Sequence, residues 1–235
     1  MKGRIAGKRE VAKGTVEFTY DVVDEAFSFT PGQYFFIRIE RLHYDDPRGN
    51  RRHFSIVNSP NQKNTIVMAT RMRDSGFKRT LAELPAGAEV QLGPITGDFT
   101  LPAAESPQVV FITGGIGITP FISMLRYARE QPLNRTITML YANRDRESAA
   151  YVDELEAAAK AMPGLRLVLT MDRDPAWRGE TRRIDADFVK DHVPDFASKS
   201  YMVAGPPGMG SSIATALAEA GVPNRNVIIE SFSGY

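Results

Sequence analysis

The first stretch with residues suited to chemistry is VVFITGGIGITPFISML at positions 109–125, which contains no charged side chain. Its length approaches that of a membrane-spanning helix, and a buried core helix also fits its composition. However, three glycines and a proline interrupt it, after four β-branched or aromatic residues and before apolar residues at helical spacing. The three glycines and the proline that interrupt it are Gly114, Gly115, Gly117 and Pro120. The order predicts a strand, a glycine turn and a helix. Backbone N–H groups at such a helix start can bind phosphate, although the same turn also occurs in ordinary α/β packing.

The segment RRHFSI at positions 51–56 combines a cation, an aromatic ring and a hydroxyl group. If it forms a strand, alternation places Arg52 and Phe54 on one face and Ser55 on the other. Such a set could pair with a phosphate, cover a planar group and donate a hydrogen bond. An ordinary half-buried strand with a solvated arginine explains the same pattern, so this segment alone leaves both interpretations open.

Two further segments contain glycines beside possible phosphate ligands. In DSGFKRTLAEL, positions 74–84, Gly76 begins a turn, Thr80 is a candidate helix cap, and two basic residues lie between them. In YMVAGPPGMG, positions 201–210, glycines and prolines form a loop directly after a predicted strand. Each segment also fits a purely structural role, the first as a capped surface helix and the second as a rigid connection.

These segments must be positioned by a chain whose two halves differ in periodicity. In the first half, apolar residues from Val16 to Val22 alternate with polar residues, which predicts a half-buried strand. Further strands are expected at YFFIRIE (34–40), RHFSIV (52–57), NTIVMATRM (64–72) and AEVQL (88–92). Turn signals separate them and helix patterns are few, so the first half predicts an antiparallel β-barrel or sandwich.

The second half alternates strands with helices. The expected strands are 109–112, 136–141, 165–169, 201–204 and 227–230, and the expected helices are 120–130, 149–161, 185–192 and 208–220. Strands separated by helices form βαβ units and a doubly wound α/β parallel sheet, which binds ligands at the carboxyl ends of its strands. We therefore expect two domains, residues 1–102 and 107–235, joined at the sequence LPAAESPQ.

Composition excludes several classes of protein and site. The 235 residues carry a net charge of +1, which gives no reason to expect a nucleic acid or a membrane surface as partner. There is no cysteine, so neither a disulfide nor a thiolate-ligated iron–sulfur cluster is possible within this chain. The three histidines are scattered singly, so no metal site is predicted. The basic first residues lack the apolar core of a signal peptide, and we expect a cytoplasmic protein.

Taken together, the motifs resemble the ferredoxin–NADP reductase family of flavoproteins over essentially the whole chain. RHFS (52–55) fits the family's flavin motif R-x-Y/F-S/T, and GGIGITP (114–120) fits its nucleotide loop G-G-x-G-x-T/A-P. AGPPGM (204–209) fits the second nucleotide loop C-G-P-P-x-M except at its first position, where alanine replaces the family's cysteine. FTPGQYF (29–35) and the ending IIESFSGY (228–235) also look like the family's sequences.

The resemblance implies that the first domain is a β-barrel that binds FAD rather than FMN, and that the second domain binds NAD(P)H. Arg52 would pair with the pyrophosphate, Phe54 would lie against the isoalloxazine, and Ser55 would hydrogen-bond near flavin N5. The implied flavin ligands are Arg52, Phe54, Ser55, Met68, Thr70, Gly76, Phe77, Lys78, Arg79, Thr80, Phe232 and Tyr235. The implied nucleotide ligands are Gly114, Gly115, Gly117, Thr119, Pro120, Arg144, Asp172, Gly205, Pro206 and Met209.

The implied activity is that of a reductase that passes hydride from NAD(P)H to FAD and then electrons to a separate soluble acceptor, such as ferredoxin or flavodoxin. Ser55, Glu230 and Phe232 are the implied catalytic residues, with the Phe232 ring stacked on the flavin until nicotinamide displaces it. Ala204, in place of the family's cysteine, is expected to slow hydride transfer. A reductase of free flavin or ferric chelates is an alternative, and a non-catalytic flavoprotein subunit is another.

Charge gives indications about the partner and the nucleotide. Residues 1–102 have a net charge of +3 and the remainder −2, which suits a small acidic redox partner for the flavin domain, although a mixed solvated surface is the simpler explanation of these charges. Asp172 would repel the 2′-phosphate of NADPH, whereas three arginines nearby would attract it. These are Arg144, Arg173 and Arg178. We expect a preference for NADH, and the oligomeric state stays open.

Overall fold

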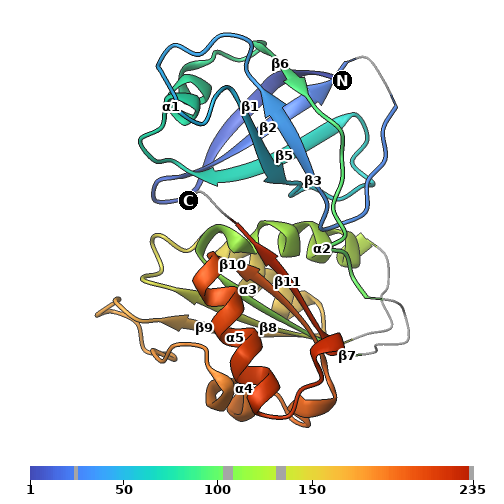
Figure 1. The fold of residues 1–235 in the computed structure, drawn as a ribbon, viewed down its shortest axis with the longest axis vertical. Helices are drawn as coiled ribbons and strands as arrows, with labels where there is room; N and C mark the ends of the chain where they lie inside the picture. Colours follow the sequence, from blue (N-terminus) through green and yellow to red (C-terminus); the bar gives the residue numbers. More distant parts are fainter. Residues whose placement is uncertain (24–25, 103–107, 131–135, 233–235) are drawn as a thin grey trace. The chain divides into compact units, whose positions relative to one another are not determined.

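The computed structural model describes residues 1–23, 26–102, 108–130 and 136–232 (Figure 1). The chain divides into two compact units. The first comprises Met1–Leu101 and Thr119–Tyr127, and the second comprises Pro102–Ile118 and Ala128–Tyr235. The division expected from the sequence placed residues 119–127 in the second domain, whereas their contacts group them with the first unit.

The first unit contains a six-stranded antiparallel sheet that curves in a barrel-like way, with the strand order β4-β3-β6-β1-β2-β5. Its strands are β1 (Lys2–Ala12), β2 (Thr15–Val22), β3 (Tyr34–Arg38), β4 (Arg51–Ser55), β5 (Thr65–Arg71) and β6 (Glu89–Leu92). β1 pairs with both β2 and β6, and β3 pairs with both β4 and β6. The antiparallel β fold expected for the first half is therefore confirmed.

Alternate residues of these strands fill one hydrophobic core. Phe18, Phe35 and Ile37 are fully buried in it, and helix α1 (Gly76–Glu83) contributes Phe77. Burial of each such side chain stabilises the fold by about 1.5–3 kcal/mol relative to exposure. The core therefore fixes β4, β5 and α1 against one another, and these three elements carry most of the predicted flavin residues.

Helix α1 begins earlier than the sequence predicted. Ser75 is its N-cap, with extended backbone and with Oγ accepting a hydrogen bond from the Lys78 N–H at 3.2 Å. Thr80 lies inside the helix, fully buried, and its Oγ1 accepts a hydrogen bond from the His43 N–H at 2.9 Å. The prediction of Thr80 as the cap was wrong because Ser75 already supplies the hydroxyl oxygen that the first free N–H groups require.

The second unit contains a five-stranded parallel sheet with the order β11-β10-β7-β8-β9. Its strands are β7 (Gln108–Gly114), β8 (Thr136–Asn143), β9 (Leu165–Met171), β10 (Ser200–Gly205) and β11 (Val227–Ser231). The helices that follow them are α2 (Thr119–Glu130), α3 (Val152–Ala161), α4 (Ala186–His192) and α5 (Pro207–Glu219). Buried residues of α4 and α5 pack with those of β7, β8 and β10 in one core. The expected α/β fold is confirmed, and α3 begins three residues later than predicted.

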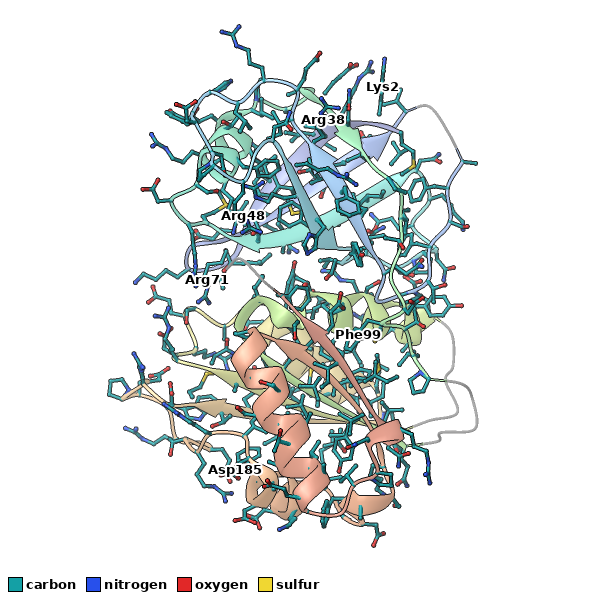
Figure 2. All side chains as sticks on the ribbon, in the orientation of Figure 1. Lys2, Arg38, Arg48, Arg71, Phe99 and Asp185 are labelled. Atoms are coloured by element: carbon teal, nitrogen blue, oxygen red, sulfur yellow. The ribbon has the colours of Figure 1, made fainter. Side chains whose placement is uncertain are left out.

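The glycine turn of the opening stretch is a 3-10 helix, η1 (Gly115–Ile118), between β7 and α2. Within the first unit, the Ser123 hydroxyl on α2 donates a hydrogen bond to the Asn58 carbonyl oxygen at 2.8 Å. The Phe121 ring packs edge-on against Phe99, labelled in Figure 2, with 5.5 Å between ring centroids. The first turns of α2 therefore pack against the antiparallel sheet's unit through a hydrogen bond and a ring contact.

No helix among the described residues has the length and apolar character needed to cross a membrane.

Candidate functional site

Two groups of donors converge on one carboxylate at the start of α1. The Arg52 guanidinium donates from Nη2 to Asp46 Oδ1 at 2.5 Å, and the Phe77 backbone N–H donates to Asp46 Oδ2 at 2.9 Å. Arg52 Nη1 donates to the carbonyl oxygens of Arg48 and Gly49, at 2.8 and 2.9 Å, which fixes the guanidinium plane. Burial alone would raise the pKa of Asp46. Hydrogen bonds from the N–H groups of Phe77 and Arg48, together with the Arg52 charge, hold that pKa below its usual range.

The charges around this point are mostly positive. The Lys78 side chain is buried and its ammonium group donates to the Arg71 carbonyl oxygen at 2.7 Å. Burial, followed by repulsion from neighbouring cations, lowers the pKa of Lys78 to about 8. These cations are Arg73, Arg52, Arg48 and Arg71, of which Arg48 and Arg71 are labelled in Figure 2. A helix start surrounded by cations has the N–H donors and the positive charge that favour an anion.

The structure brings Arg52, Phe77 and Lys78 together, and it places Gly76 where the helix start meets the backbone of a neighbouring loop. A Cβ atom at Gly76 would lie 2.5 Å from the Tyr44 carbonyl oxygen and 2.4 Å from that of Asp45. Arg79 points elsewhere, since it is exposed and its guanidinium lies over the Tyr44 ring at 3.8 Å. Met68 and Thr70 on β5 are also candidate flavin ligands, and both side chains are fully buried.

Phe54 and Ser55 are both buried at the end of β4. The Phe54 ring is 3% exposed and lies 6.2 Å from the Phe77 ring, within the hydrophobic core. Ser55 Oγ is buried and has no hydrogen-bond partner among the described residues. A buried hydroxyl without a partner is unfavourable, so Ser55 is ready to bond to a ligand.

Sequence reasoning missed three rings on the outer face of β3 and β4. Tyr34, Phe36 and His53 form a cluster with ring centroids 5.5 to 6.0 Å apart. Tyr34 is the register partner of Ser55, so the cluster and the unpartnered hydroxyl share one face of the sheet. Burial, then the charges of Arg48 and Arg52, lower the pKa of His53. Alternation along β3 and β4 could have identified these rings. Phe35 and Phe54 point into the core, so the neighbouring side chains must point to the outer face.

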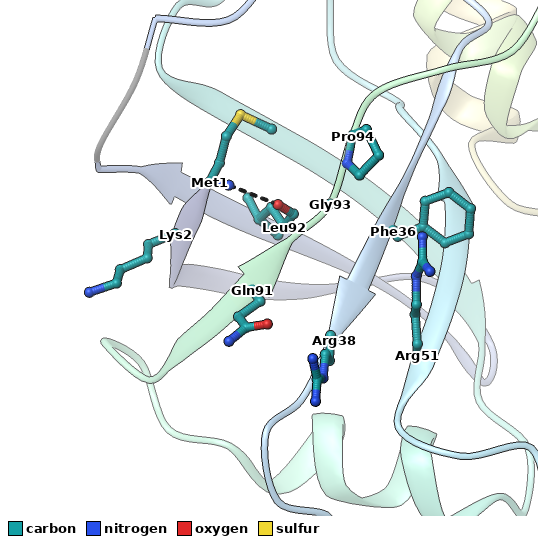
Figure 3. A pocket seen from close by; sticks show the side chains of 9 residues that line it. All are labelled: Met1, Lys2, Phe36, Arg38, Arg51, Gln91, Leu92, Gly93 and Pro94. Carbon is teal, nitrogen blue, oxygen red and sulfur yellow. Dashed lines mark hydrogen bonds between the residues drawn. The ribbon is translucent and has the colours of Figure 1, made fainter.

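A pocket of about 540 Å³ lies on the first unit beside this ring cluster (Figure 3). Lys2, Arg38 and Arg51 line it, together with Gln91 and Phe36. The Arg51 guanidinium lies over the Phe36 ring at 3.8 Å, which holds one cation in place. Among the described residues, none of these three cations forms an ion pair with a carboxylate, so the pocket wall is positively charged.

In the second unit, glycines allow two loops at the carboxyl edge of the sheet to approach closely. A Cβ atom at Gly117 would lie 2.5 Å from the Ala204 carbonyl oxygen, and one at Gly114 would lie 2.6 Å from Met209 Sδ. Gly115 has φ +56°, in the left-handed region that favours glycine. The structure therefore brings the two predicted nucleotide loops together.

The other predicted residues of these loops lie at element ends. Thr119 and Pro120 are buried in the first turn of α2, Gly205 ends β10, and Pro206 is the exposed N-cap of α5.

A row of three side chains crosses β7, β10 and β11. Ala204 pairs in register with Thr113 on one side and with Glu230 on the other. Thr113 Oγ1 and Glu230 Oε2 are buried and have no hydrogen-bond partner among the described residues. Burial raises the pKa of Glu230 to about 7. Two unsatisfied polar groups thus flank the small Ala204 side chain at the edge where this type of sheet binds ligands.

The ends of β8 and β9 bring together the residues expected to select the nucleotide. The Asp172 N–H donates to the Asn143 carbonyl oxygen at 3.2 Å, and the Arg173 N–H donates to the Arg144 carbonyl oxygen at 2.7 Å. The side chains of Asp172, Arg144 and Arg173 are exposed, and Asn143 Nδ2 is buried without a partner among the described residues. Arg178 is exposed and bonds to carbonyl oxygens of its own loop.

Phe232, the last described residue, lies beside the second nucleotide loop. The Phe232 N–H donates to the Gly205 carbonyl oxygen at 3.1 Å, and the Phe232 side chain is 4% exposed. Tyr235 lies outside the described residues. Among the described residues, no three His, Asp or Glu side chains are grouped to bind a metal ion.

Comparison with known proteins matches residues 111–215 to the family described as Oxidoreductase NAD-binding domain. The chain is 29% identical over 231 residues to an NADPH oxidoreductase of Mycobacterium tuberculosis, covering 96% of this chain and 58% of that protein. It is 27% identical over 247 residues to ferredoxin–NADP reductase B of Sorangium cellulosum, covering 99% of this chain and 97% of that protein. Flavohemoprotein A of Dictyostelium discoideum is 22% identical, and the chain again spans 58% of its length.

Solved structures share the fold. The cytochrome P450 reductase GcoB of Amycolatopsis superposes with a TM-score of 0.82 at 22% identity, covering 99% of this chain and 70% of that chain. The FAD/NAD binding domain of nitric oxide dioxygenase from Vibrio cholerae gives a TM-score of 0.83 at 17% identity, covering 98% of each chain. Together with the motifs and the two folds, these matches make the chain similar to the ferredoxin–NADP reductase family of oxidoreductases, whose fold it shares.

Proposed function

We propose that this chain is an NAD(P)H-dependent flavoprotein reductase, whose first unit holds FAD and whose second unit binds the nicotinamide nucleotide. The observation that carries the proposal is the convergence of Arg52 and the Phe77 N–H on a single carboxylate, within a cluster of cations. A site that already binds two anionic oxygens through a guanidinium and a helix start has the donors that a pyrophosphate requires. FAD, when bound, accepts two electrons from a nicotinamide and releases them singly.

The residues of the first unit fit a flavin. Arg52, Lys78 and the N–H groups at the start of α1 would hold the pyrophosphate. The Ser55 hydroxyl, which is buried and unpartnered, would donate to the ring system. The outer rings of Tyr34 and His53 offer aromatic surface on the same face as Ser55. The Phe54 ring lies in the core, where it can offer little surface to a ligand. We therefore propose that these outer rings contact the flavin ring system as well as Phe54.

The second unit would hold the nucleotide at the carboxyl edge of its sheet. The backbone of Gly114, Gly115 and Gly117 would contact the phosphates, since glycine carries no side chain of its own to cover its N–H group. Thr113 and Glu230 would hydrogen-bond the nicotinamide amide, which supplies both a donor and an acceptor.

We propose NADH as the preferred nucleotide, because Asp172 is exposed at the ribose end of this edge. Asp172→Ser should raise kcat/KM for NADPH by about tenfold and lower that for NADH, which steady-state kinetics with both nucleotides would measure. The proposal would be wrong if the wild-type protein strongly prefers NADPH and the Asp172→Ser variant has unchanged kinetics. Asp172 would then not select between the two nucleotides.

The test of the overall function is an anaerobic titration of the purified protein with NADH and NADPH, followed through the flavin absorbance. Retained FAD that is bleached by NAD(P)H supports the proposal. Protein that retains no flavin but oxidises NADH when flavin or a ferric chelate is added would support a free-flavin or ferric-chelate reductase instead. Retained flavin that neither nucleotide bleaches would support a non-catalytic flavoprotein subunit.

We also propose that the electron acceptor is a small acidic redox protein such as a ferredoxin or a flavodoxin. The support is the positively charged pocket lined by Lys2, Arg38 and Arg51 on the flavin-binding unit (Figure 3). Replacing Arg38 and Arg51 together by Glu should lower the rate of electron transfer to ferredoxin or flavodoxin at least tenfold at low salt. NADH reduction of the bound flavin should not change. Arg41→Glu, at another exposed site of the same unit, is the control.

A further inference from the structure

The loop between β3 and β4 is strapped across the start of α1. We define residues 43–49 as the strap. The His43 N–H donates to Thr80 Oγ1 at 2.9 Å, and the Tyr44 hydroxyl donates to Glu83 Oε1 at 2.6 Å. The Arg79 guanidinium covers the Tyr44 ring. Three contacts along the helix therefore hold the strap in one position.

At the centre of the strap, Asp46 occupies two of the donors that the proposed function gives to the flavin pyrophosphate. One carboxylate oxygen takes Arg52 and the other takes the Phe77 N–H, and the Asp46 side chain is 2% exposed. The strap backbone also passes directly over Gly76, where even a Cβ atom would collide with carbonyl oxygens. A phosphate group has no access to this helix start while the strap stays in place.

We infer that Asp46 is an internal occupant of the flavin-phosphate site, so that loading of the flavin exchanges one anion for another. This inference rests on the proposed function for the identity of the ligand. The carboxylate presents two oxygens to the same donors as a phosphate does, but it carries one negative charge. Arg48, Arg71 and Arg73 surround the site with further positive charge, which favours a pyrophosphate of two negative charges over Asp46 when flavin is available.

The exchange makes Asp46 a determinant of flavin affinity. Free flavin must displace an ion pair before it can bind, and the measured affinity is reduced by the fraction of molecules in which the strap is closed. Removing the Asp46 charge should therefore strengthen flavin binding. If Asp46 instead stays paired with Arg52 in the flavin-bound protein and orients it, removing its charge should weaken flavin binding. The two possibilities predict opposite signs.

The experiment compares apoproteins of the wild type, Asp46→Asn and Asp45→Asn. Asp45 is the adjacent exposed residue of the strap, and its replacement changes the net charge by the same amount. Fluorescence quenching of FAD should give a dissociation constant at least tenfold lower for Asp46→Asn than for the other two proteins. Isothermal titration with inorganic pyrophosphate should show the same order. Asp46→Asn should also melt at a lower temperature than the wild type without flavin, and at a similar temperature when saturated with FAD.

Tyr44→Phe provides a second route, because it removes the strap's bond to Glu83 without changing a phosphate donor. It should strengthen FAD binding in the same direction, and it decides the question if Asp46→Asn does not fold. Equal or weaker FAD binding by the variants would overturn the inference while leaving the proposed function intact. If no protein binds flavin but pyrophosphate binding still strengthens in Asp46→Asn, the proposed function fails and the exchange stands.

Discussion

Glu230 on β11 lies in register beside Ala204 on β10, and its carboxyl group is buried without a partner among the described residues. This neighbourhood explains why the pKa of Glu230 rises to about 7, since burial penalises the charged form and no cation offsets it.

The raised pKa of Glu230 makes stability depend on pH. Because the pKa in the folded protein exceeds the ordinary value of 4.5, the folded state keeps a proton that the unfolded chain releases. Stability contributed by this group is therefore fully present below about pH 4.5 and is lost as pH rises towards 7. At pH 8 the free energy of unfolding of Glu230→Gln should exceed that of the wild type by up to about 3 kcal/mol, and its melting temperature should be higher. Both differences should shrink at pH 5. Glu219→Gln, at an exposed position, is the control, and a constant difference across pH would contradict this account.

Arg52→Ala should yield protein that is largely free of flavin. The mutation removes a charge-assisted contact of about 1.5–3 kcal/mol per hydrogen bond to the pyrophosphate. It also leaves the buried Asp46 carboxylate without its cation, so the apoprotein should be destabilised by about 3 kcal/mol. The ratio of flavin to protein absorbance after purification measures the first effect, and thermal unfolding measures the second. Arg41→Ala should change neither, and normal flavin content in Arg52→Ala would rule out the assigned role.

Gly117→Ala should destabilise the second unit, because the added methyl group would lie 2.5 Å from the backbone oxygen of Ala204. We expect a loss of about 1–3 kcal/mol together with weaker nucleotide binding. Gly208→Ala provides the matched control, since a Cβ atom there meets nothing within 4 Å and helix α5 should gain up to about 1 kcal/mol. Melting temperatures of the two variants should therefore move in opposite directions, and equal shifts would mean that close packing at Gly117 is unimportant.

Phe232→Ala should alter the visible spectrum of the flavin and change the apparent affinity for NAD(P)H. The Phe232 backbone is fixed to Gly205 and its side chain is buried, so we expect the ring to hold a defined position. Truncation after Glu230 should have the same effect. Difference spectra and nucleotide titrations check both variants, and unchanged spectra with unchanged affinities would show that the ring does not cover the flavin.

The strands and helices of the second unit could be predicted because the strands are rich in apolar and β-branched residues and segments with helical spacing separate them. β1 could not, since Lys2–Ala12 carries exposed Arg4, Lys8 and Arg9, and its pairing with β2 and β6 makes it a strand. Propensity gives little information here, because one of the two partner strands, β6, is distant in sequence.

The candidate site was predictable to the extent that its residues lie within short motifs. Arg52, Ser55 and Gly117 could be identified from local patterns. The role of Asp46 could not, because it depends on a contact with Phe77, 31 residues further along the chain. Thr80 was assigned to the wrong role for the same reason, since its hydroxyl bonds to His43 in a distant loop.

The grouping of Thr119–Tyr127 with the first unit has a consequence for protein engineering. A chimera cut at the proline-containing joint would separate Ser123 and Phe121 from Asn58 and Phe99, and would leave apolar surface exposed on the isolated flavin half. Exchange of flavin halves between homologues therefore has to carry this helical segment along with residues 1–101, as a discontinuous cassette rather than a single stretch of the gene.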